Sequence, residues 1–215
     1  MILDADGFGP EAIGKQIDVS RETIERLEAV LGCLDIYRQR MNLIGPAEWD
    51  HIWRRHVADS LRLVPLVPLA AKVVDLGSGG GFPALPLACV LTSMGSGHVT
   101  MIETVGKKAT FLRAAVEAAS LNATVRQGRV EKATDIAADI VTARAFAPLP
   151  KLLDYAAPWL LNGATGLFHK GEQWKEELTA ASKGWTFAYE GIPGDDGGAG
   201  IILKIAEVSR GRTQN

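Results

Sequence analysis

The sequence predicts an α/β protein with a mostly parallel, Rossmann-like sheet that ends in an antiparallel hairpin, preceded by a helical layer. Short β-branched runs alternate with helix-length segments after Pro68, which is typical of parallel strands joined by crossover helices. A glycine-rich segment follows the first run, and a turn-rich linker separates the last two. We expect residues 1–68 to form an N-terminal arm and helical layer and residues 69–215 a Rossmann-like domain, together making one compact unit.

The first 68 residues are expected to be helical apart from a loose arm. Residues 1–18 show little hydrophobic periodicity, so we predict no regular structure there. Ser20 can cap a helix that runs through residue 41, and Gly45-Pro46 ends it and starts a second helix. The apolar stripes comprise Ile24, Leu27, Leu31, Leu34 and Met41 in the first helix and Ile52, Trp53, Val57, Leu61 and Val64 in the second.

The remaining chain alternates between predicted strands and helices. The strands are Lys72–Leu76, His98–Glu103, Ala123–Gln127, Asp139–Ala143 and Thr165–His169. The helical stretches between and after them start near Pro83, Lys107, Glu131, Leu149 and Glu172. Finally, Trp185–Gly191 and Gly200–Val208 flank the turn-rich linker 193–198, which suits an antiparallel hairpin at the sheet edge. Parallel strands followed by such a hairpin fit the class I methyltransferase sheet better than the dehydrogenase sheet.

The amino-acid composition excludes few functions, but it helps to predict the cellular compartment of the protein. A net charge of −2, with 47% hydrophobic and 22% charged residues, gives no global reason to expect nucleic acid, so an RNA partner has to be argued from local sites. Cys33 and Cys89 lie in apolar helical patterns and are expected to be buried, reduced thiols. The acidic N-terminus does not resemble a signal peptide, and the longest apolar run, Ala84–Leu91, is too short to span a bilayer. We therefore expect a cytoplasmic protein without membrane contact.

The glycine segment Val73–Pro83 predicts the ligand. It follows a buried strand and leads into a helix, so its backbone can approach a ligand at the carboxyl end of a parallel sheet. A dinucleotide fingerprint requires a third glycine where Phe82 stands, and no Lys-Ser or Lys-Thr follows as in a P-loop. A nucleotide-like ligand without phosphates remains, and S-adenosylmethionine is the common one. These features favour a class I S-adenosylmethionine-dependent methyltransferase.

Acidic residues at strand ends are candidates for holding the adenosyl group. Glu103 ends the second strand, where a carboxylate can accept hydrogen bonds from both ribose hydroxyls, although a capping residue is the simpler reading of an isolated acid. Asp75 could orient the glycine loop or face the methionine amine, and we leave both open. Gly128–Glu131 follows the third strand, where a purine ring would lie; Glu131 would equally suit a plain helix start.

The segment Thr142–Leu149 follows the fourth strand, beside the expected position of the reactive methyl group. Enzymes that methylate exocyclic base amines commonly carry an Asn or Asp, two prolines and an aromatic residue here, whereas this chain has Arg144. Arg144 is a candidate for the donor site. Pairing with a carboxylate at the pocket edge is its alternative role.

On these residues the chain resembles the bacterial 16S ribosomal RNA guanine-N7 methyltransferases known as RsmG or glucose-inhibited division protein B. The likeness is densest from residue 42 to 171 and depends on the order and spacing of several motifs. These are Asn42-Leu43; Arg55-His56 with Asp59-Ser60-Leu61; the glycine segment; Lys107-Lys108 with Phe111-Leu112; Gly128–Glu131; Thr142–Ala145; and Lys170-Gly171. Ile44, Thr104 and Ala84 depart from the threonine, serine and glycine that are usual in the family.

The resemblance implies a cofactor, a substrate and a partner. The cofactor is S-adenosyl-L-methionine, and the matching motif positions that would contact it are Gly77, Phe82, Val130, Glu131 and Arg144. The glycine turn adds Ser78 and Gly79 to this set, and the strand-end argument adds Glu103. The substrate is one guanine in the 530 loop of 16S ribosomal RNA, within the small ribosomal subunit or its precursor. We expect a monomer that uses no metal ion.

Guanine N7 carries a lone pair and no proton, so its methylation needs no general base and we assign none. A donor bonded to N7 would block the reaction, so a basic side chain that recognises the base should address O6. Arg144 and Lys170 are the candidates. Lys170 could equally contact a phosphate or be an ordinary exposed lysine.

The second helix carries the tentative RNA-facing residues. Arg55, His56, Asp59 and Ser60 lie in its middle at helical spacing. A histidine hydrogen-bonded between helix and sheet is the plainer interpretation of His56. Positive charge gathers in this layer and could bind phosphates or simply form a solvated helix face; the arginines are Arg38, Arg40, Arg54, Arg55 and Arg62. Trp49 and Trp53 are expected to pack in the core rather than stack on bases.

Other functions are weighed against this interpretation. A class I methyltransferase acting on a small molecule or a protein would not need the arginine cluster. A non-catalytic ribosome-binding module with the same fold would not bind S-adenosylmethionine. An NAD-dependent oxidoreductase fits least, because the glycine spacing fails and no catalytic Tyr-Lys or Cys-His arrangement stands out.

Overall fold

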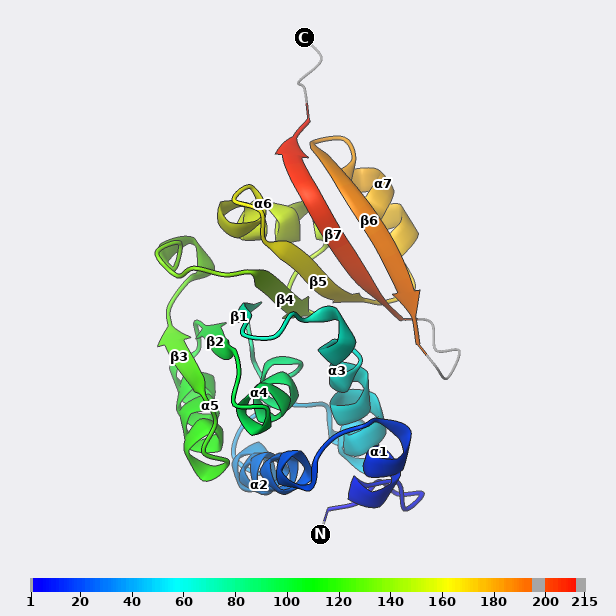
Figure 1. Cartoon of the computed structure of the whole chain (residues 1–215), viewed down its shortest axis with the longest axis vertical. Coiled ribbons are helices and arrows are strands. Elements are labelled where there is room, and N and C mark those ends of the chain that lie inside the picture. The colour runs from blue at the N-terminus through cyan, green and yellow to red at the C-terminus, as the bar shows by residue number, and fades with distance from the viewer. Residues whose placement is uncertain (1, 195–199, 212–215) are drawn as a thin grey trace.

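The computed structural model describes residues 2–194 and 200–211 and places a mixed sheet between helical layers (Figure 1). Within these residues seven strands stand in the order β3-β2-β1-β4-β5-β7-β6. The parallel strands are β1 (Lys72–Leu76), β2 (His98–Glu103), β3 (Ala123–Gln127), β4 (Ile140–Arg144) and β5 (Thr165–Lys170). β6 (Trp185–Pro193) and β7 (Ile201–Arg210) form an antiparallel hairpin, in which β7 pairs with β5. The predicted fold class is confirmed.

The strand order places a topological switch point at the centre of the sheet. β1 pairs with β2 on one side and with β4 on the other, with Asp75 opposite Thr142. Crossovers leave the adjacent carboxyl ends of β1 and β4 in opposite directions, which opens a crevice there in sheets of this kind. The glycine segment and Arg144 both lie at this crevice.

Helices cover both faces of the sheet. α4 (Ala84–Ser93) and α5 (Gly106–Ala118) pack on one face, and α6 (Leu149–Leu160) and α7 (Trp174–Ala181) lie on the other (Figure 1). α2 (Arg21–Arg38) packs in turn on α4 and α5. The N-terminal layer therefore shares its hydrophobic core with one face of the sheet, and Leu27 and Val73 belong to the same buried cluster.

The expectation of a loose N-terminal arm is wrong for the part of it that the structure describes. Residues 10–16 form α1 (Pro10–Gln16), and its Ile13 is fully buried. Asp4 is buried and its carboxylate accepts hydrogen bonds from the backbone N–H groups of Trp53 and Arg54, at 2.8 and 3.0 Å. Hydrophobic periodicity could not reveal this segment, because scattered contacts hold it: the Asp4 carboxylate, the buried Ile13, and the carbonyl oxygen of Ile2, which accepts the indole N–H of Trp53.

The two predicted N-terminal helices are present with different ends. Ser20 caps α2 as expected, since its hydroxyl accepts a hydrogen bond from the N–H of Thr23, but the helix ends at Arg38 rather than residue 41. The second helix is divided into several short pieces. They are the 3₁₀ turn η1 (Pro46–His51), the π-helical turn η2 (Trp53–Ala58), α3 (Asp59–Leu61) and the 3₁₀ turn η3 (Val64–Leu66).

The helix expected from Glu131 is reduced to the 3₁₀ turn η4 (Val130–Lys132). Residues 133–139 then run as a loop to the start of β4. The indole N–H of Trp159 in α6 donates to the carbonyl oxygen of Ile136 at 2.6 Å and fixes this loop. The predicted hairpin is present, while residues 195–198 of its predicted linker lie outside the described residues.

The cysteines match the expectation of free thiols. Both Cys33 in α2 and Cys89 in α4 are free, Cys33 being half-buried and Cys89 fully buried. Burial raises the pKa of the Cys89 thiol to about 12, so the thiol stays protonated. Across residues 2–194 and 200–211, none of the helices has both the length and the apolar character needed to cross a membrane.

Asp4 is expected to stabilise the whole helical layer. Asp4→Ala would leave the N–H groups of Trp53 and Arg54 without their acceptor, so we expect the free energy of unfolding to fall by about 1–3 kcal/mol. Urea denaturation followed by circular dichroism measures this change. The matched control is Asp6→Ala, because Asp6 pairs with Arg54 at the surface. Equal losses from the two variants would contradict the assignment.

Candidate cofactor and acceptor site

The glycine loop between β1 and α4 has a backbone that few other residues could adopt. Gly77, Gly79 and Gly81 have φ angles of +67°, +51° and +88°. A Cβ on Gly80 would lie 2.5 Å from the carbonyl oxygen of Leu43, so only glycine fits at this position as well. The N–H groups of Gly77 and Ser78 donate to the carbonyl oxygen of Ile102, which ties the loop to β2. The loop is thereby fixed before any ligand binds.

Glu103 holds this loop through its carboxylate. One oxygen accepts the N–H of Gly79 at 2.8 Å and the other accepts the N–H of Val105 at 2.7 Å, and the side chain is buried. Both carboxylate oxygens therefore already have backbone partners. A contact between Glu103 and a ribose stays a prediction, and the structure adds a second role in orienting the turn.

Asp75 faces β4. Its Oδ1 accepts a hydrogen bond from the hydroxyl of Thr142 at 2.7 Å, whereas the buried Oδ2 has no partner within the described residues. Burial raises the pKa of the Asp75 carboxyl from 3.8 to about 6. Hydrogen bonds from Ser78 and Thr142 oppose this rise. Asp75 is therefore an aspartate held in a largely apolar environment directly beneath the glycine loop.

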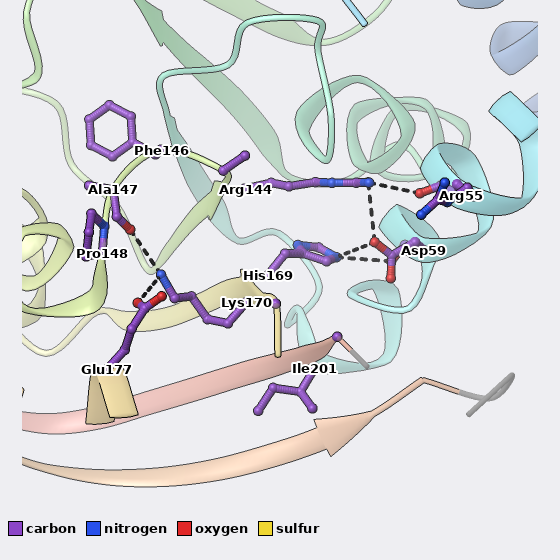
Figure 2. Close-up of a pocket in the computed structure, with 13 residues that line it drawn as sticks. Arg55, Asp59, Arg144, Phe146, Ala147, Pro148, His169, Lys170, Glu177 and Ile201 are labelled. Atoms are coloured by element: carbon purple, nitrogen blue, oxygen red, sulfur yellow. Dashed lines mark hydrogen bonds and ion pairs between the residues drawn. The ribbon is translucent and has the colours of Figure 1, made fainter. Parts of the chain in front are cut away.

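Cavities adjoin one another at the carboxyl ends of β1 and β4. The glycine-loop pocket, of about 380 Å³, is lined by residues that include Glu48, His56, Gly77, Phe82 and Lys108. The Val130 pocket, of about 290 Å³, is lined by Val130, Glu131, Phe146 and Tyr155 among others. The β5 pocket, of about 620 Å³, lies between Arg55, Asp59 and Arg144 on one side and Lys170 and Glu177 on the other (Figure 2).

The segment 144–148 is shared by these cavities. Arg144 and Ala145 line both the glycine-loop pocket and the β5 pocket, and Phe146 lines both the Val130 pocket and the β5 pocket. A Cβ on Gly77 would lie 2.3 Å from the Phe146 ring, so that ring packs directly on the glycine loop. Ala145 has a φ of +51°, a conformation costly for a residue with a side chain. Such strain at a junction of cavities is typical of functional sites.

Arg144 connects β4 to the helical layer. Its guanidinium lies 3.3 Å from the Asp59 carboxylate and donates to the carbonyl oxygen of Arg55 at 3.0 Å (Figure 2). Asp59 also pairs with Arg62 at 2.7 Å, and its carbonyl oxygen accepts the Nε2–H of His169. The structure confirms that Arg144 pairs with a carboxylate, and it also lines two cavities. Its contact with a methyl donor stays a prediction.

Lys170 and Glu177 form the opposite wall of the β5 pocket. The Lys170 ammonium lies 2.6 Å from the Glu177 carboxylate and donates to the carbonyl oxygen of Ala147 at 3.0 Å. The same Glu177 oxygen accepts the N–H of Leu149 at 2.6 Å, where α6 begins. Lys170 is therefore neither an ordinary exposed lysine nor a free cation, because its side chain is only 8% exposed.

The two histidines at the site are held neutral. Burial, followed by the nearby Arg144 charge, lowers the pKa of His56 to about 4. Its ring packs on Phe82 at a centroid distance of 4.9 Å, and its Nε2 lies 3.4 Å from the Glu48 carboxylate. Burial likewise lowers the pKa of His169. Neither residue carries a proton available for acid catalysis near neutral pH.

The structure gathers most of the predicted site residues and separates a few. Gly77, Ser78, Gly79, Phe82, His56 and Arg144 line the glycine-loop pocket. Val130 and Glu131 line the Val130 pocket, and Arg55, Asp59 and Lys170 line the β5 pocket. Ser60 is fully buried and donates its hydroxyl hydrogen to the His56 carbonyl oxygen, so it supports the helix from inside.

Sequence reasoning missed Glu48, Phe146, His169 and Glu177. His169 stands next to Lys170 and Phe146 next to Ala145, so adjacency to a motif was the available signal for these two. Glu177 offers none, because it enters the site only through the packing of α7. Among the tryptophans, Trp53 is fully buried as expected, while Trp49 lies beneath the Arg38 guanidinium at 3.8 Å from the ring centroid.

Solved structures of methyltransferases share this architecture. The fold is similar to an O-methyltransferase from Bacillus cereus solved in complex with SAH, with a TM-score of 0.59 and 16% identity, covering 92% of this chain and 96% of that one. It is also similar to a methyltransferase from Geobacter sulfurreducens, with a TM-score of 0.60 and 16% identity over 83% of this chain and 88% of that one. The sheet order, the glycine turn and the cavities at its edge define a class I methyltransferase fold.

Sequence comparison narrows this class to a family. The family model described as rRNA small subunit methyltransferase G matches residues 23–191, and the chain belongs to this family. A ribosomal RNA small subunit methyltransferase G from Hyphomonas neptunium is 61% identical over 90% of this chain and 92% of the relative. Its counterpart from Paramagnetospirillum magneticum is 42% identical over 96% of this chain and 100% of the relative. The resemblance stated from the motifs is confirmed.

The raised pKa of Asp75 predicts a pH-dependent contribution to stability. A carboxyl that binds its proton more tightly in the folded state stabilises the fold least where it is ionised, so its contribution declines as the pH rises from about 4 to about 6. We expect Asp75→Asn, which keeps an acceptor for Thr142, to gain stability relative to the wild type over this interval, by a total on the order of 3 kcal/mol. Urea denaturation of both proteins across that interval tests this, and a constant difference would refute it.

Proposed function

We propose that this chain is a cytoplasmic, monomeric enzyme that transfers a methyl group from S-adenosyl-L-methionine to N7 of a guanine in the 530 loop of 16S ribosomal RNA. Family membership supports a small-subunit ribosomal RNA as the substrate. The observation that carries the proposal is the position of the segment 144–148 between the cavities. A donor on the glycine-loop side and an acceptor base on the β5 side would meet at Arg144 and Ala145.

The residues of the two smaller cavities fit the cofactor. Gly77, Ser78, Gly79 and Gly80 line the glycine-loop pocket with backbone, so a ligand can approach the chain closely there. Lys108 and Arg144 offer positive charge and Glu48 negative charge in the glycine-loop pocket, which suits the carboxylate and ammonium of an amino acid. Val130 and Tyr155 give the Val130 pocket an apolar wall suited to a purine ring. When bound, S-adenosylmethionine supplies a methyl group activated on a sulfonium.

The chain's own residues perform positioning. Attack by the N7 lone pair forms the nitrogen–carbon bond and leaves the electron pair of the broken carbon–sulfur bond on sulfur. No proton moves, so this reaction requires no general base. The pocket that would receive the purine is lined by both carboxylates and basic groups, with Asp59 paired to Arg144 and Glu177 paired to Lys170. Holding the acceptor and donor in line supplies the rest of the rate enhancement.

The exposure and the ion pairs of the predicted RNA-facing residues decide which of them can contact RNA. Arg55 is exposed, and its guanidinium forms no ion pair in the described part of the chain, so it is free to bind a phosphate at the mouth of the β5 pocket. Asp59 positions Arg144 and does not approach RNA phosphates. His56 and Ser60 are buried and keep the second helix in shape beneath Arg55.

The substrate assignment is tested by mapping N7-methylguanosine in small-subunit ribosomal RNA from cells with and without the gene. We expect the modification in the 530 loop to disappear on deletion and to return with the intact chain. Gly77→Asp should not restore it, because its side chain would meet the Phe146 ring from a strained backbone.

Gly14→Ala is the matched control, since a Cβ on Gly14 would meet nothing within 4 Å. This variant should restore the modification. Titration calorimetry with S-adenosylmethionine separates the alternatives: a non-catalytic ribosome-binding module would show no binding. An enzyme acting on a small molecule or a protein would bind the cofactor yet leave the ribosomal modification unchanged by deletion.

Arg55→Ala should weaken RNA binding without altering the chemical step. Losing one phosphate contact should raise KM for small-subunit particles about tenfold and leave kcat nearly unchanged. The slope of log KM against log salt concentration should change by about one. Arg113→Ala, at an exposed arginine on α5, is the control. A fall in kcat with unchanged salt dependence would contradict a phosphate contact.

A further inference from the structure

The ion pair between Lys170 and Glu177 faces the β5 pocket from the side opposite Arg144. Both residues line this cavity, and Figure 2 shows Arg144 directed toward Asp59 while Lys170 turns toward Glu177 and Ala147. The Glu177 side chain is 23% exposed. The pair is thus held in place and borders the cavity.

Each partner of this pair keeps hydrogen-bonding capacity. A lysine ammonium has three donors, and Lys170 directs two of them to Glu177 and Ala147. Glu177 uses its Oε2 for both Lys170 and the N–H of Leu149, and no hydrogen bond in the described part of the chain reaches its Oε1. One donor and one acceptor therefore stand side by side at the wall of the cavity.

This donor and acceptor match one edge of guanine. Around the guanine ring O6 lies between N7 and N1, so its Watson–Crick edge presents the O6 acceptor followed by the N1–H and N2–H donors. Adenine presents the reverse, a donor at N6 followed by an acceptor at N1. Ala145, Lys170 and Glu177 line the same cavity, so a guanine whose N7 is directed at Ala145 can be oriented with O6 and N1–H toward Lys170 and Glu177.

The cavity is large enough for an extruded nucleotide. Its volume of about 620 Å³ falls in the range of about 300–1,000 Å³ that accommodates small ligands. Enzymes that modify a base inside folded nucleic acid commonly read the extruded base through hydrogen bonds to its Watson–Crick edge. Lys170 and Glu177 lie at the inner wall of the pocket and can serve as such a reader, whereas Arg144 already pairs with Asp59 and donates to the carbonyl oxygen of Arg55.

We propose that Lys170 and Glu177 read the Watson–Crick edge of the target guanine, with Lys170 donating to O6 and Glu177 accepting from N1–H. This inference rests on the proposed function and adds the residues that determine base specificity. A purely structural alternative gives the pair one task, which is to hold the segment 144–148 through Ala147 and Leu149. Substituting Lys170 or Glu177 distinguishes the two roles, because it weakens the preference for guanine over other bases only if the pair reads the base.

The experiment uses small-subunit particles reconstituted with 16S RNA that carries guanine or 2-aminopurine at the target position. 2-Aminopurine keeps N7 but lacks O6 and N1–H. Methyl transfer from labelled S-adenosylmethionine gives kcat/KM for each, and we expect the wild type to prefer guanine by about 100-fold or more.

Glu177→Gln should reduce this preference to within about tenfold. The Leu149 N–H and the Lys170 ammonium would donate to the single carbonyl oxygen of the glutamine amide. The NH₂ group of this amide would then face N1 of the base. That group repels the N1–H of guanine and can donate to the N1 of 2-aminopurine. Lys170→Met, which removes the donor to O6, should reduce the preference as well.

Glu176→Gln is the matched control, because Glu176 neighbours Glu177 on α7 and is exposed. It should keep the wild-type preference. If Glu177→Gln and Lys170→Met lower kcat/KM equally for both bases and keep the preference, the pair only supports the loop and the inference is overturned. Failure of the wild type to methylate the guanine particle would instead refute the proposed function.

Discussion

The ion pair between Asp59 and Arg144 is the contact on which the site depends. Asp59 belongs to the divided second helix and Arg144 ends β4, so a single interaction joins the N-terminal layer to the centre of the sheet. Asp59 also pairs with Arg62, and its backbone carbonyl accepts a hydrogen bond from His169 on β5. Because the Arg144 side chain is only 22% exposed, loss of this carboxylate would leave a poorly solvated charge between two cavities. The positions of Arg55 and of the segment after β4 both follow from this contact.

The segment 144–148 illustrates that the proposed reaction requires the protein to position groups rather than to transfer protons. The proposed reaction at guanine N7 requires no proton transfer. The site contains neutral histidines, a strained backbone at Ala145 and ion pairs that hold loops in place. The site therefore contributes mainly by holding its groups in fixed positions. The Phe146 ring packs against Gly77, and the Glu103 carboxylate accepts the N–H of the nearby Gly79. These contacts order the loop before a ligand binds.

The sheet was predictable from sequence and parts of the site were not, for physical reasons. β-Branched runs specify buried strands locally, so the five parallel strands were placed within a residue or two. The placement of Gly77 and Arg144 near each other was predictable because the glycine turn and the strand ends converge in any parallel sheet, whereas Phe82 was named through the family resemblance. Asp4, by contrast, acts across nearly fifty residues of chain on Trp53, and Glu177 reaches the site only through the packing of α7. The loop before β4 is likewise held by Trp159 of α6, whose indole N–H donates to the carbonyl oxygen of Ile136. Such contacts leave no periodic pattern in sequence.

The hairpin at the end of the chain also closes the site that begins near its start. Arg62 pairs with Asp59 and donates to the carbonyl oxygen of Ile192 on β6, and Ile201 of β7 lines the β5 pocket. During synthesis the helical layer and the first strands emerge long before these residues. The nascent protein can thus form its glycine loop while the β5 pocket still lacks a wall. The β5 pocket is completed last, once β7 has left the ribosome, and fragments that end before β6 lack the wall that Ile201 provides.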